Sequence, residues 1–290
     1  MIKNGYLFNF IKFPLNPKKS KKYVINLRSQ IFMEKQPLIS IITVVYNGEK
    51  TLEQTIVSVL SQTYPNIEYI IIDGKSSDGT IDIVSKYADK ISKYVSEKDN
   101  GIYDAMNKGL ALANGDIIGL LNADDFYEPD TIENVVNFYA PGLNIYYGAI
   151  RNIEENNDSF IRKATDNLEK LKRGMVINHP AMFVNNEVYE MLGGFNISYK
   201  VSADWDFTLR CYLARVNFFK IDKILTNFRI DGVSGAITTK YLHEMSQVRK
   251  TNGLFDNVDP YYWYDLLRFR LLGKNLHKLY LLKQKLLSAK

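Results

Sequence analysis

The chain has 290 residues, which is enough for one large domain or two small ones with a substantial core. Hydrophobic residues account for 46% and charged residues for 24%, the proportions of an ordinary soluble globular protein. A single cysteine, Cys211, excludes a disulfide framework and fits a reducing compartment, and no apolar run approaches the ~20 residues of a membrane-spanning helix.

The net charge of +5 is unevenly distributed along the chain. The first 36 residues carry eight Lys or Arg and one Glu, and the last 30 carry seven and one Asp, so the middle is acidic. An acidic middle argues against nucleic acid as a partner of the main domain. The two basic ends favour contact with an anionic partner such as a membrane surface, and solvated tails are the equal alternative.

The leader over residues 1–36 lacks the composition of a secretory signal peptide, because its apolar stretches are short and broken by Lys3, Asn9 and Lys12. We therefore expect a cytoplasmic protein, with the inner face of the cell membrane as a second location. Pro37 ends the leader. We expect a main domain over 37–250 and a basic amphipathic helical segment over 251–290.

Strands and helices alternate in the first part of the main domain. The predicted strands are rich in β-branched and aliphatic residues and lie at 38–46, 67–73, 91–97 and 116–123. The predicted helices each have an apolar face and lie at 51–62, 78–88 and 102–115. Thr51 and Gln54 have the spacing of a capping box. The alternation predicts an α/β fold with a parallel sheet and helices on both faces.

The pattern loosens after residue 141. A strand is predicted at 144–150, and a strand followed by a short helix at 178–195. A further helix is predicted at 202–214, with Ser202 as its N-cap. A long helix is predicted at 262–290, and its apolar stripe consists of Phe269, Leu272, Leu276, Leu279, Leu282 and Leu286.

Polar residues follow three of the predicted strands at the point where each strand ends. Asn47 follows the first strand, Asp73 ends the second, and Asp124 with Asp125 follows the fourth. Each residue alone is also typical of a turn or a helix cap. Because ligands of parallel α/β sheets bind at the carboxyl ends of the strands, their joint placement indicates one binding crevice.

Asp124 and Asp125 are adjacent carboxylates that resist burial unless a positive charge compensates them. Carboxylate oxygens are ligands for Mg²⁺ or Mn²⁺, which often share them with substrate phosphates. The sequence has no His/Cys cluster with zinc spacing and no Gly-rich phosphate loop after a strand. The pair therefore predicts a site for Mn²⁺ or Mg²⁺ that also holds a diphosphate.

Several segments together resemble glycosyltransferase family 2, the inverting enzymes of the GT-A fold. They include "ISIITVVYNGEKTLEQTIVSVLSQTYPNIEYIIIDGKSSDGT" (39–80), "NGIYDAMNKGLALANGDIIGLLNADD" (100–125) and "GGFNISYKVSADWDFTLR" (193–210), and the resemblance extends over about 37–235. It implies a GT-A fold, with a Rossmann-like, mostly parallel sheet, to which the C-terminal helical segment is an extension.

The resemblance also implies roles for individual residues. Asp73 matches the carboxylate that holds the base and ribose of the nucleotide, usually uridine diphosphate, and Thr43, Tyr46 and Asn47 line the same pocket. Asp124 and Asp125 match the metal motif, although its first acidic place is Asn122 here. Asp204 matches the catalytic base, although the Glu that precedes it in the family is Ala203 here. A helix-capping role is the alternative for Asp204.

Two further residues are weaker candidates. His179 precedes Pro180, and the family pattern places such a histidine near the acceptor or the diphosphate, whereas a structural histidine is the alternative. Lys108 has the reach to bind a phosphate as a point charge, and it is equally typical of a solvated helix position.

The implied reaction is metal-dependent transfer of a sugar, with inversion, from a nucleotide-diphosphate donor to a hydroxyl of a glycan or lipid-linked acceptor. Bacterial envelope polysaccharide synthesis is the process in which many family members act. A nucleotidyltransferase that makes sugar nucleotides is one alternative, and a GT-A binding protein that has lost catalysis is another. The donor sugar, the acceptor and the oligomeric state are left open by the sequence.

Overall fold

The computed structural model describes residues 36–154, 156, 158–230, 238–256 and 258–273, and the single positions 275, 279, 282, 283, 285 and 286. The chain divides into two compact units, Met1–Pro37 and Leu38–Lys290. The basic leader predicted over 1–36 lies outside the described residues except for Gln36.

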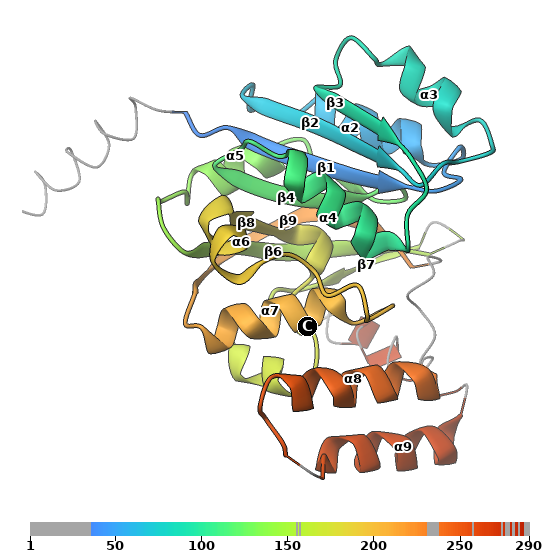
Figure 1. Ribbon diagram of the computed structural model, residues 1–290, viewed down its shortest axis with the longest axis vertical. Helices are drawn as coiled ribbons and strands as arrows, with labels where there is room; N and C mark the ends of the chain where they lie inside the picture. The colour runs from blue at the N-terminus through green and yellow to red at the C-terminus, as the bar shows by residue number, and fades with distance from the viewer. Residues whose placement is uncertain are drawn as a thin grey trace, which may run out of the picture. The chain divides into compact units, whose positions relative to one another are not determined.

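Four parallel strands form the first half of the sheet, in the order β3-β2-β1-β4 (Figure 1). They are β1 (Ile39–Val45), β2 (Ile67–Asp73), β3 (Lys93–Ser96) and β4 (Ile117–Asn122), which confirms all four predicted strands. Every residue of β1 is buried, because helices cover both faces of the strand.

The second half of the sheet is mixed. β8 (Met182–Asn185) pairs antiparallel with β4 and with β6 (Asn144–Ile153), and β9 (Asn217–Arg229) runs parallel to β6. The short strands β5 (Phe126–Tyr127) and β7 (Ser159–Arg162) pair with β9 and β6. β9 was not predicted, because Lys220, Asp222 and Lys223 interrupt its apolar pattern.

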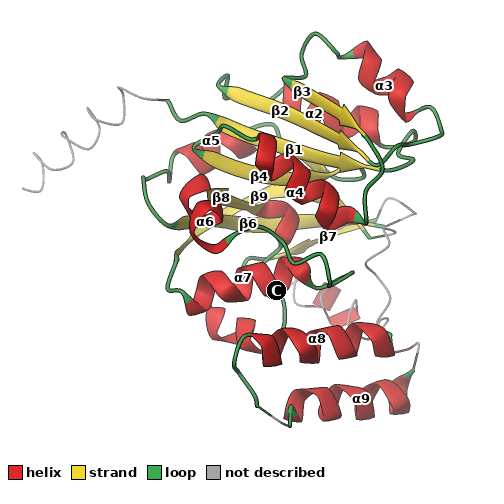
Figure 2. Ribbon diagram, viewed as in Figure 1, coloured by secondary structure: helices red, strands yellow, loops and turns green. Residues whose placement is uncertain are grey.

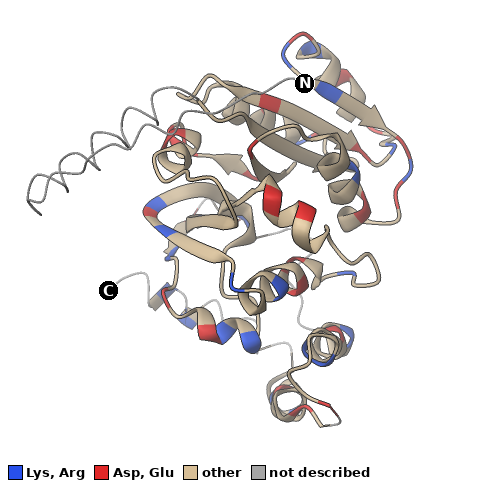
Figure 3. Cartoon of the chain, turned by 60° about the vertical axis from the view of Figure 1, so that its left-hand side comes forward, with Lys and Arg blue, Asp and Glu red and all other residues tan. Residues whose placement is uncertain are grey.

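Helices cover both faces of the sheet, as predicted (Figure 2). One apolar layer includes α2 (Leu52–Leu60), α3 (Thr80–Lys86) and α5 (Thr131–Val136). The other layer includes α4 (Ile102–Leu112), α6 (Asn186–Leu192), α7 (Ala203–Leu213) and α8 (Thr239–Thr251). Two 3₁₀ turns lie at Leu168–Lys172 and His179–Ala181. The strands are mostly free of charge, and Lys, Arg, Asp and Glu lie mainly on helices and loops (Figure 3).

Two predicted helix caps are wrong. The Thr51 side chain makes no capping hydrogen bond, and Gly48 O instead accepts from the backbone N–H groups of Thr51 and Leu52. The Gln54 side-chain oxygen accepts from Arg229 and not from the Thr51 backbone N–H, so the capping box is not formed. Ser202 precedes α7 as predicted, but its hydroxyl is buried without a hydrogen-bond partner among the described residues.

The long helix predicted over 262–290 is also wrong in its start and its continuity. α9 (Pro260–Leu272) begins two residues earlier, where Asp259 accepts from two backbone N–H groups of its first turn. It ends at Gly273, whose φ of 49° is in the left-handed region. Phe269, a member of the predicted apolar stripe, packs against the core. Much of the predicted helix beyond Gly273, including Leu276, lies outside the described residues.

None of the helices in the described part of the chain is long and apolar enough to span a membrane. α8 and α9 pack side by side and lie beyond α7 (Figure 1). They are held together at a buried ion pair between Arg249 and Asp259, 2.7 Å apart, with each side chain 1% exposed.

Candidate active site at the carboxyl ends of the strands

The register of the parallel strands brings the polar strand ends together. Val45 pairs with Asp73, Asp73 pairs with Ser96, and Val44 pairs with Asn122. The residues that follow β1, β2 and β4 therefore emerge at one edge of the sheet. This arrangement is the one that the sequence predicted for Asn47, Asp73 and the Asp124–Asp125 pair.

Asp73 is completely buried at the end of β2, and both of its carboxylate oxygens accept hydrogen bonds from serines. Oδ1 accepts from the Ser76 hydroxyl at 2.5 Å, and Oδ2 accepts from the Ser96 hydroxyl at 2.5 Å. The Ser76 backbone N–H also donates to Oδ1 at 3.1 Å. Asp73 therefore fixes the loop after β2 against the end of β3.

The loop after β1 is tied to the same serine loop. Asn47 has a left-handed φ of 51°, its backbone N–H donates to Ser76 Oγ at 2.7 Å, and its Oδ1 accepts from Ser77 N at 2.9 Å. Tyr46 lies on the rim with 67% of its surface exposed. Thr43 lies further back in the core, where its hydroxyl is 3.1 Å from the Tyr69 hydroxyl.

Lys108 lies on α4 and is engaged by neighbouring groups on the surface. Its Nζ is 2.9 Å from a carboxylate oxygen of Glu97 and donates to Lys98 O at 2.9 Å. The hydrogen bond with Glu97 raises the pKa of Lys108. Its charge is therefore already paired.

Hydrogen bonds from α2 fix the backbone of the Asp124–Asp125 turn. The Thr55 hydroxyl donates to Ala123 O at 2.9 Å and to Asp125 O at 2.7 Å. Asp125 is completely buried, and its Oδ1 accepts from Arg229 N at 3.1 Å. Burial, and then the neighbouring charge of Asp124, raises the pKa of Asp125 well above its usual range.

Arg229, at the end of β9, is the positive charge beside these carboxylates. Its guanidinium donates to Asp124 O and to Gln54 Oε1, and it lies 5.2 Å from the centre of the Phe126 ring. Burial raises the pKa of Asp124, whereas the charge of Arg229 lowers it. Sequence reasoning missed Arg229, because 105 positions separate it from Asp124.

The oxygen atoms around this turn fit a hard divalent cation. Asn122 Oδ1 and Asp125 Oδ2 are buried without a hydrogen-bond partner in the described residues, and Asp124 is partly exposed. The described residues include no group of three or more His, Cys, Asp or Glu able to hold a metal. An ion here would take its remaining ligands from water and a bound phosphate, as Mg²⁺ commonly does.

Asp204 lies in the first turn of α7 and is held by a residue from α4. The Tyr103 hydroxyl donates to Asp204 Oδ1 at 3.0 Å. Burial, and then the charge of Asp204, raises the pKa of Tyr103 well above its usual range, so this hydroxyl stays protonated. Tyr103 was not a predicted site residue, although it lies in the first turn of the helix that follows β3 at the same sheet edge.

His179 lies near this carboxylate. Its Nε2 is buried without a hydrogen-bond partner among the described residues, and the residue as a whole is partly exposed. Its ring packs against Phe195 with centroids 5.9 Å apart, and Tyr103 contacts the same phenylalanine at 5.7 Å. Burial lowers the pKa of His179, and the charge of Asp204 opposes that shift.

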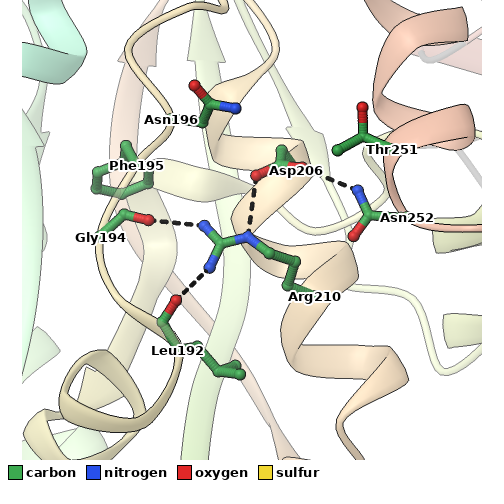
Figure 4. Close-up of a pocket in the computed structure, with 8 residues that line it drawn as sticks. All are labelled: Leu192, Gly194, Phe195, Asn196, Asp206, Arg210, Thr251 and Asn252. Carbon is green, nitrogen blue, oxygen red and sulfur yellow. Dashed lines mark hydrogen bonds and ion pairs between the residues drawn. The ribbon is translucent and has the colours of Figure 1, made fainter.

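Asp206, two residues after Asp204, belongs to a separate pocket of about 330 Å³ between the loop after α6 and the end of α8. Arg210 lies between Asp206 and the carbonyl oxygens of Leu192 and Gly194, and Asn252 donates to Asp206 (Figure 4). These polar groups bond one another, so the pocket has a structural role in joining α7 to α8.

Known proteins similar to this chain are glycosyltransferases. Residues 40–208 match the model of glycosyl transferase family 2. A PGL/p-HBAD biosynthesis glycosyltransferase of Mycobacterium bovis is 33% identical over 183 residues, which cover 61% of this chain and 70% of that protein. Chondroitin synthase of Escherichia coli is 32% identical over 213 residues, which cover 71% of this chain and 31% of that enzyme.

Solved structures agree with the fold. S. aureus TarS 1–349 in complex with UDP has a TM-score of 0.59 at 18% identity, covering 77% of this chain and 67% of that one. The mannosyltransferase PcManGT from Pyrobaculum calidifontis, in complex with GDP-Man and Mn²⁺, has a TM-score of 0.57 at 19% identity, covering 88% and 79%. The predicted GT-A fold is confirmed.

Proposed function

This chain belongs to glycosyltransferase family 2, and from that premise we propose that it moves a sugar from a nucleotide-diphosphate donor to a hydroxyl of a glycan or lipid-linked acceptor. The observation that carries the proposal is the meeting of the β1, β2 and β4 ends at one edge of the sheet. That edge presents acceptors for a nucleotide beside a turn of two aspartates. Family membership decides against the nucleotidyltransferase alternative.

The donor is proposed to be a uridine diphosphate sugar. The S. aureus TarS structures with UDP and UDP-GlcNAc support this choice, and PcManGT with GDP-Man makes a guanosine nucleotide the alternative to test. Tyr46 and Asn47 would contact the nucleotide directly, because Tyr46 is exposed on the rim. Asp73 would shape the pocket through its two serines, and Thr43 lies behind it. Lys108 has the weakest support, because Glu97 already pairs with it.

Asp124 is the leading residue to hold Mn²⁺ or Mg²⁺, with Asp125 and the Asn122 amide oxygen as its neighbours. When bound, such an ion acts as a Lewis acid that neutralises charge on the diphosphate leaving group. Thr55 holds the backbone of the turn, and this keeps the Asp124 carboxylate at the rim of the sheet.

Asp204 is proposed as the general base. The Tyr103 hydroxyl occupies one carboxylate oxygen at 3.0 Å, and a carboxylate has a second oxygen that can accept the proton of the acceptor hydroxyl. The acceptor oxygen then attacks the anomeric carbon from the face opposite the nucleotide as the bond from that carbon to the diphosphate oxygen breaks. The nucleoside diphosphate leaves, and this single displacement inverts the stereochemistry. His179 beside the site stays neutral at pH 7, because burial lowers its pKa, and it is proposed to border the acceptor.

The Asp204→Asn variant tests this assignment. We expect sugar transfer to fall by about 10² to 10⁴-fold, because general-base catalysis contributes that much. Binding of UDP, measured by calorimetry with Mn²⁺, should stay within about twofold of wild type. Transfer close to the wild-type rate would contradict the base assignment. A wild-type protein that binds nucleotide but transfers no sugar would instead favour the binding protein without catalysis.

The acceptor is proposed to be presented at an anionic lipid surface, as in bacterial envelope polysaccharide synthesis, and α9 is the surface that would meet it. Tyr262, Leu266 and Phe269 pack against the core. On the other side, Trp263 and Leu267 are 61% and 58% exposed. A helix that is apolar on both sides is usually covered on both sides.

Charge favours a lipid surface over a second copy of the chain. Arg268 and Arg270 flank the exposed side of α9, and Asp265 lies 4.0 Å from Arg268 with 19% of its side chain exposed. Two such faces packed together would place arginines against arginines. Tryptophan, leucine and arginine on one exposed face are typical of a helix that lies in a membrane interface.

Sedimentation with lipid vesicles tests this contact. We expect binding to phosphatidylglycerol-containing vesicles, weakened by salt, and weak binding to pure phosphatidylcholine. Trp205 is 2% exposed, so a blue shift of tryptophan fluorescence would come from Trp263. Leu271→Glu should weaken binding about tenfold, whereas Ile81→Glu on α3 should not. Equal vesicle binding by the two variants would contradict the membrane contact. If wild type forms dimers and Leu271→Glu is monomeric, a second copy of the chain covers α9 instead.

A further inference from the structure

Neither the sequence nor the comparisons assign a role to Arg229. Its backbone N–H donates to Asp125 Oδ1 at 3.1 Å, and its guanidinium donates to Asp124 O and Gln54 Oε1. Parallel pairing of β6 with β9 runs through Arg229, and β9 ends at the edge where β4 ends. The guanidinium is therefore fixed beside the turn that is proposed to hold the metal.

The acceptors that hold this guanidinium are neutral. A backbone carbonyl and an amide oxygen engage two of its nitrogens, whereas a guanidinium carries five N–H donors. Within the described part of the chain, Arg229 forms no ion pair with a carboxylate. This differs from Arg151 on the neighbouring strand, which pairs with Glu128 at 3.1 Å. Arg229 thus keeps its full charge and unused donors at the edge.

Without a metal ion, the two carboxylates of the turn offer a diphosphate no positive partner. Asp124 and Asp125 carry at most two negative charges, since the place before them is the neutral Asn122. The guanidinium donates to the backbone carbonyl of Asp124, and the Arg229 backbone N–H donates to Asp125 Oδ1, so the positive charge lies directly at the turn. A planar guanidinium binds phosphate through paired N–H groups, which a lysine cannot reproduce.

We propose that Arg229 binds the diphosphate of the donor and supplies a resident positive charge when no divalent ion is present. This inference rests on the proposed function, because it requires a nucleotide diphosphate at the strand ends. It predicts that nucleotide binding is only partly dependent on metal. It also predicts that the contribution of Arg229 is largest in the absence of metal and absent for a nucleoside that lacks phosphate.

Calorimetric titration of UDP and uridine, in EDTA and in Mn²⁺, tests the inference with Arg229→Met. We expect wild type to bind UDP in EDTA, and the variant to bind it about tenfold more weakly, the scale of a charge-assisted hydrogen bond. The loss should be smaller in Mn²⁺, and uridine binding should be unchanged. GDP replaces UDP, with guanosine replacing uridine, if UDP gives no binding heat.

Two other variants control for a purely structural role. Arg151→Met removes an arginine of the neighbouring strand β6, whose side chain bonds Asn227 and Glu128. This variant should leave UDP binding within about twofold of wild type. If Arg229→Met does not fold, as judged by circular dichroism, Gln54→Ala carries the comparison. It removes one of the two acceptors that hold the guanidinium, and we expect about a threefold loss in EDTA.

The possible outcomes separate this inference from the proposed function. If the variant loses UDP and uridine binding equally, or matches wild type for UDP in EDTA, Arg229 is only a tether. Wild type that binds UDP only with Mn²⁺ also overturns the resident charge and leaves the proposed function intact. No binding of UDP or GDP under either condition overturns the proposed function, and the role of Arg229 with it.

Discussion

The buried ion pair between α8 and α9 gives the sharpest prediction of stability. Arg249 and Asp259 are 2.7 Å apart, each with 1% of its side chain exposed. Arg249 also donates to Arg173 O at 2.9 Å and lies 5.7 Å from the Trp205 ring. Asp259 also caps α9, because its Oδ1 accepts from the N–H groups at the start of that helix.

Asp259→Ala removes both tasks of this carboxylate. It leaves Arg249 buried without its counter-charge, which costs about 3 to 5 kcal/mol. It also removes a helix cap worth about 1 kcal/mol. We expect the free energy of unfolding to fall by about 4 to 6 kcal/mol in total, measured by urea denaturation with circular dichroism.

Asp259→Asn separates the two tasks, because asparagine is a good cap but carries no charge. It should cost about 1 kcal/mol less than Asp259→Ala. The double variant Arg249→Met, Asp259→Asn leaves no buried charge unpaired and should recover most of the lost stability. A loss below about 1.5 kcal/mol in Asp259→Ala, or no recovery in the double variant, would refute the reasoning that this pair is desolvated.

Three other substitutions have expected outcomes. The pKa of Asp125 is raised in the folded protein. Its protonated carboxyl therefore stabilises the fold fully below the unfolded pKa of about 3.9, and this stabilisation is lost as pH rises through the pKa of the folded state. Asp125→Asn should therefore lose less stability than wild type between pH 5 and 8 in thermal unfolding without metal, and identical slopes would contradict this. Tyr103→Phe should lower transfer about tenfold, with UDP binding unchanged, because Asp204 loses its hydrogen bond at 3.0 Å; an unchanged rate would leave Tyr103 without a positioning role. Gly109→Ala should destabilise by about 1 to 3 kcal/mol in urea denaturation, since its Cβ would lie 2.3 Å from Ile42, and a neutral effect would mean that Ile42 moves freely.

The first half of the fold was predictable because its signals are local. β1 to β4 are short aliphatic runs between turns, and α2 to α4 have apolar faces at helical spacing, so each element is marked by its own residues. β9 and α8 were missed. In β9 the exposed positions 217, 219, 222 and 223 do not alternate regularly with buried ones, and they include a lysine, so partners such as β6 decide its conformation more than its own residues do.

In the site, too, the residues that are marked by local sequence were predictable and those that depend on distant contacts were not. The strand-end residues Asn47, Asp73, Asp124 and Asp125 could be placed at one edge from strand order alone. Tyr103 could not, because its role depends on a contact with Asp204, 101 positions away. The capping box failed for a related reason, since Arg229 engages the Gln54 side chain that a cap would need. A local sequence pattern cannot indicate that a residue so distant in sequence will bond the same side chain.

The late position of β9 in the chain has a consequence for synthesis on the ribosome. The strands β1 to β4 emerge first and are complete by Asn122, so they can pair while the rest of the chain is still being made. Until Arg229 emerges, however, Asp125 lacks the backbone N–H that its carboxylate accepts from. About a hundred further residues must therefore be synthesised before the aspartate turn is complete, and a nascent chain stalled before β9 should hold the sheet edge without the finished nucleotide end of the site.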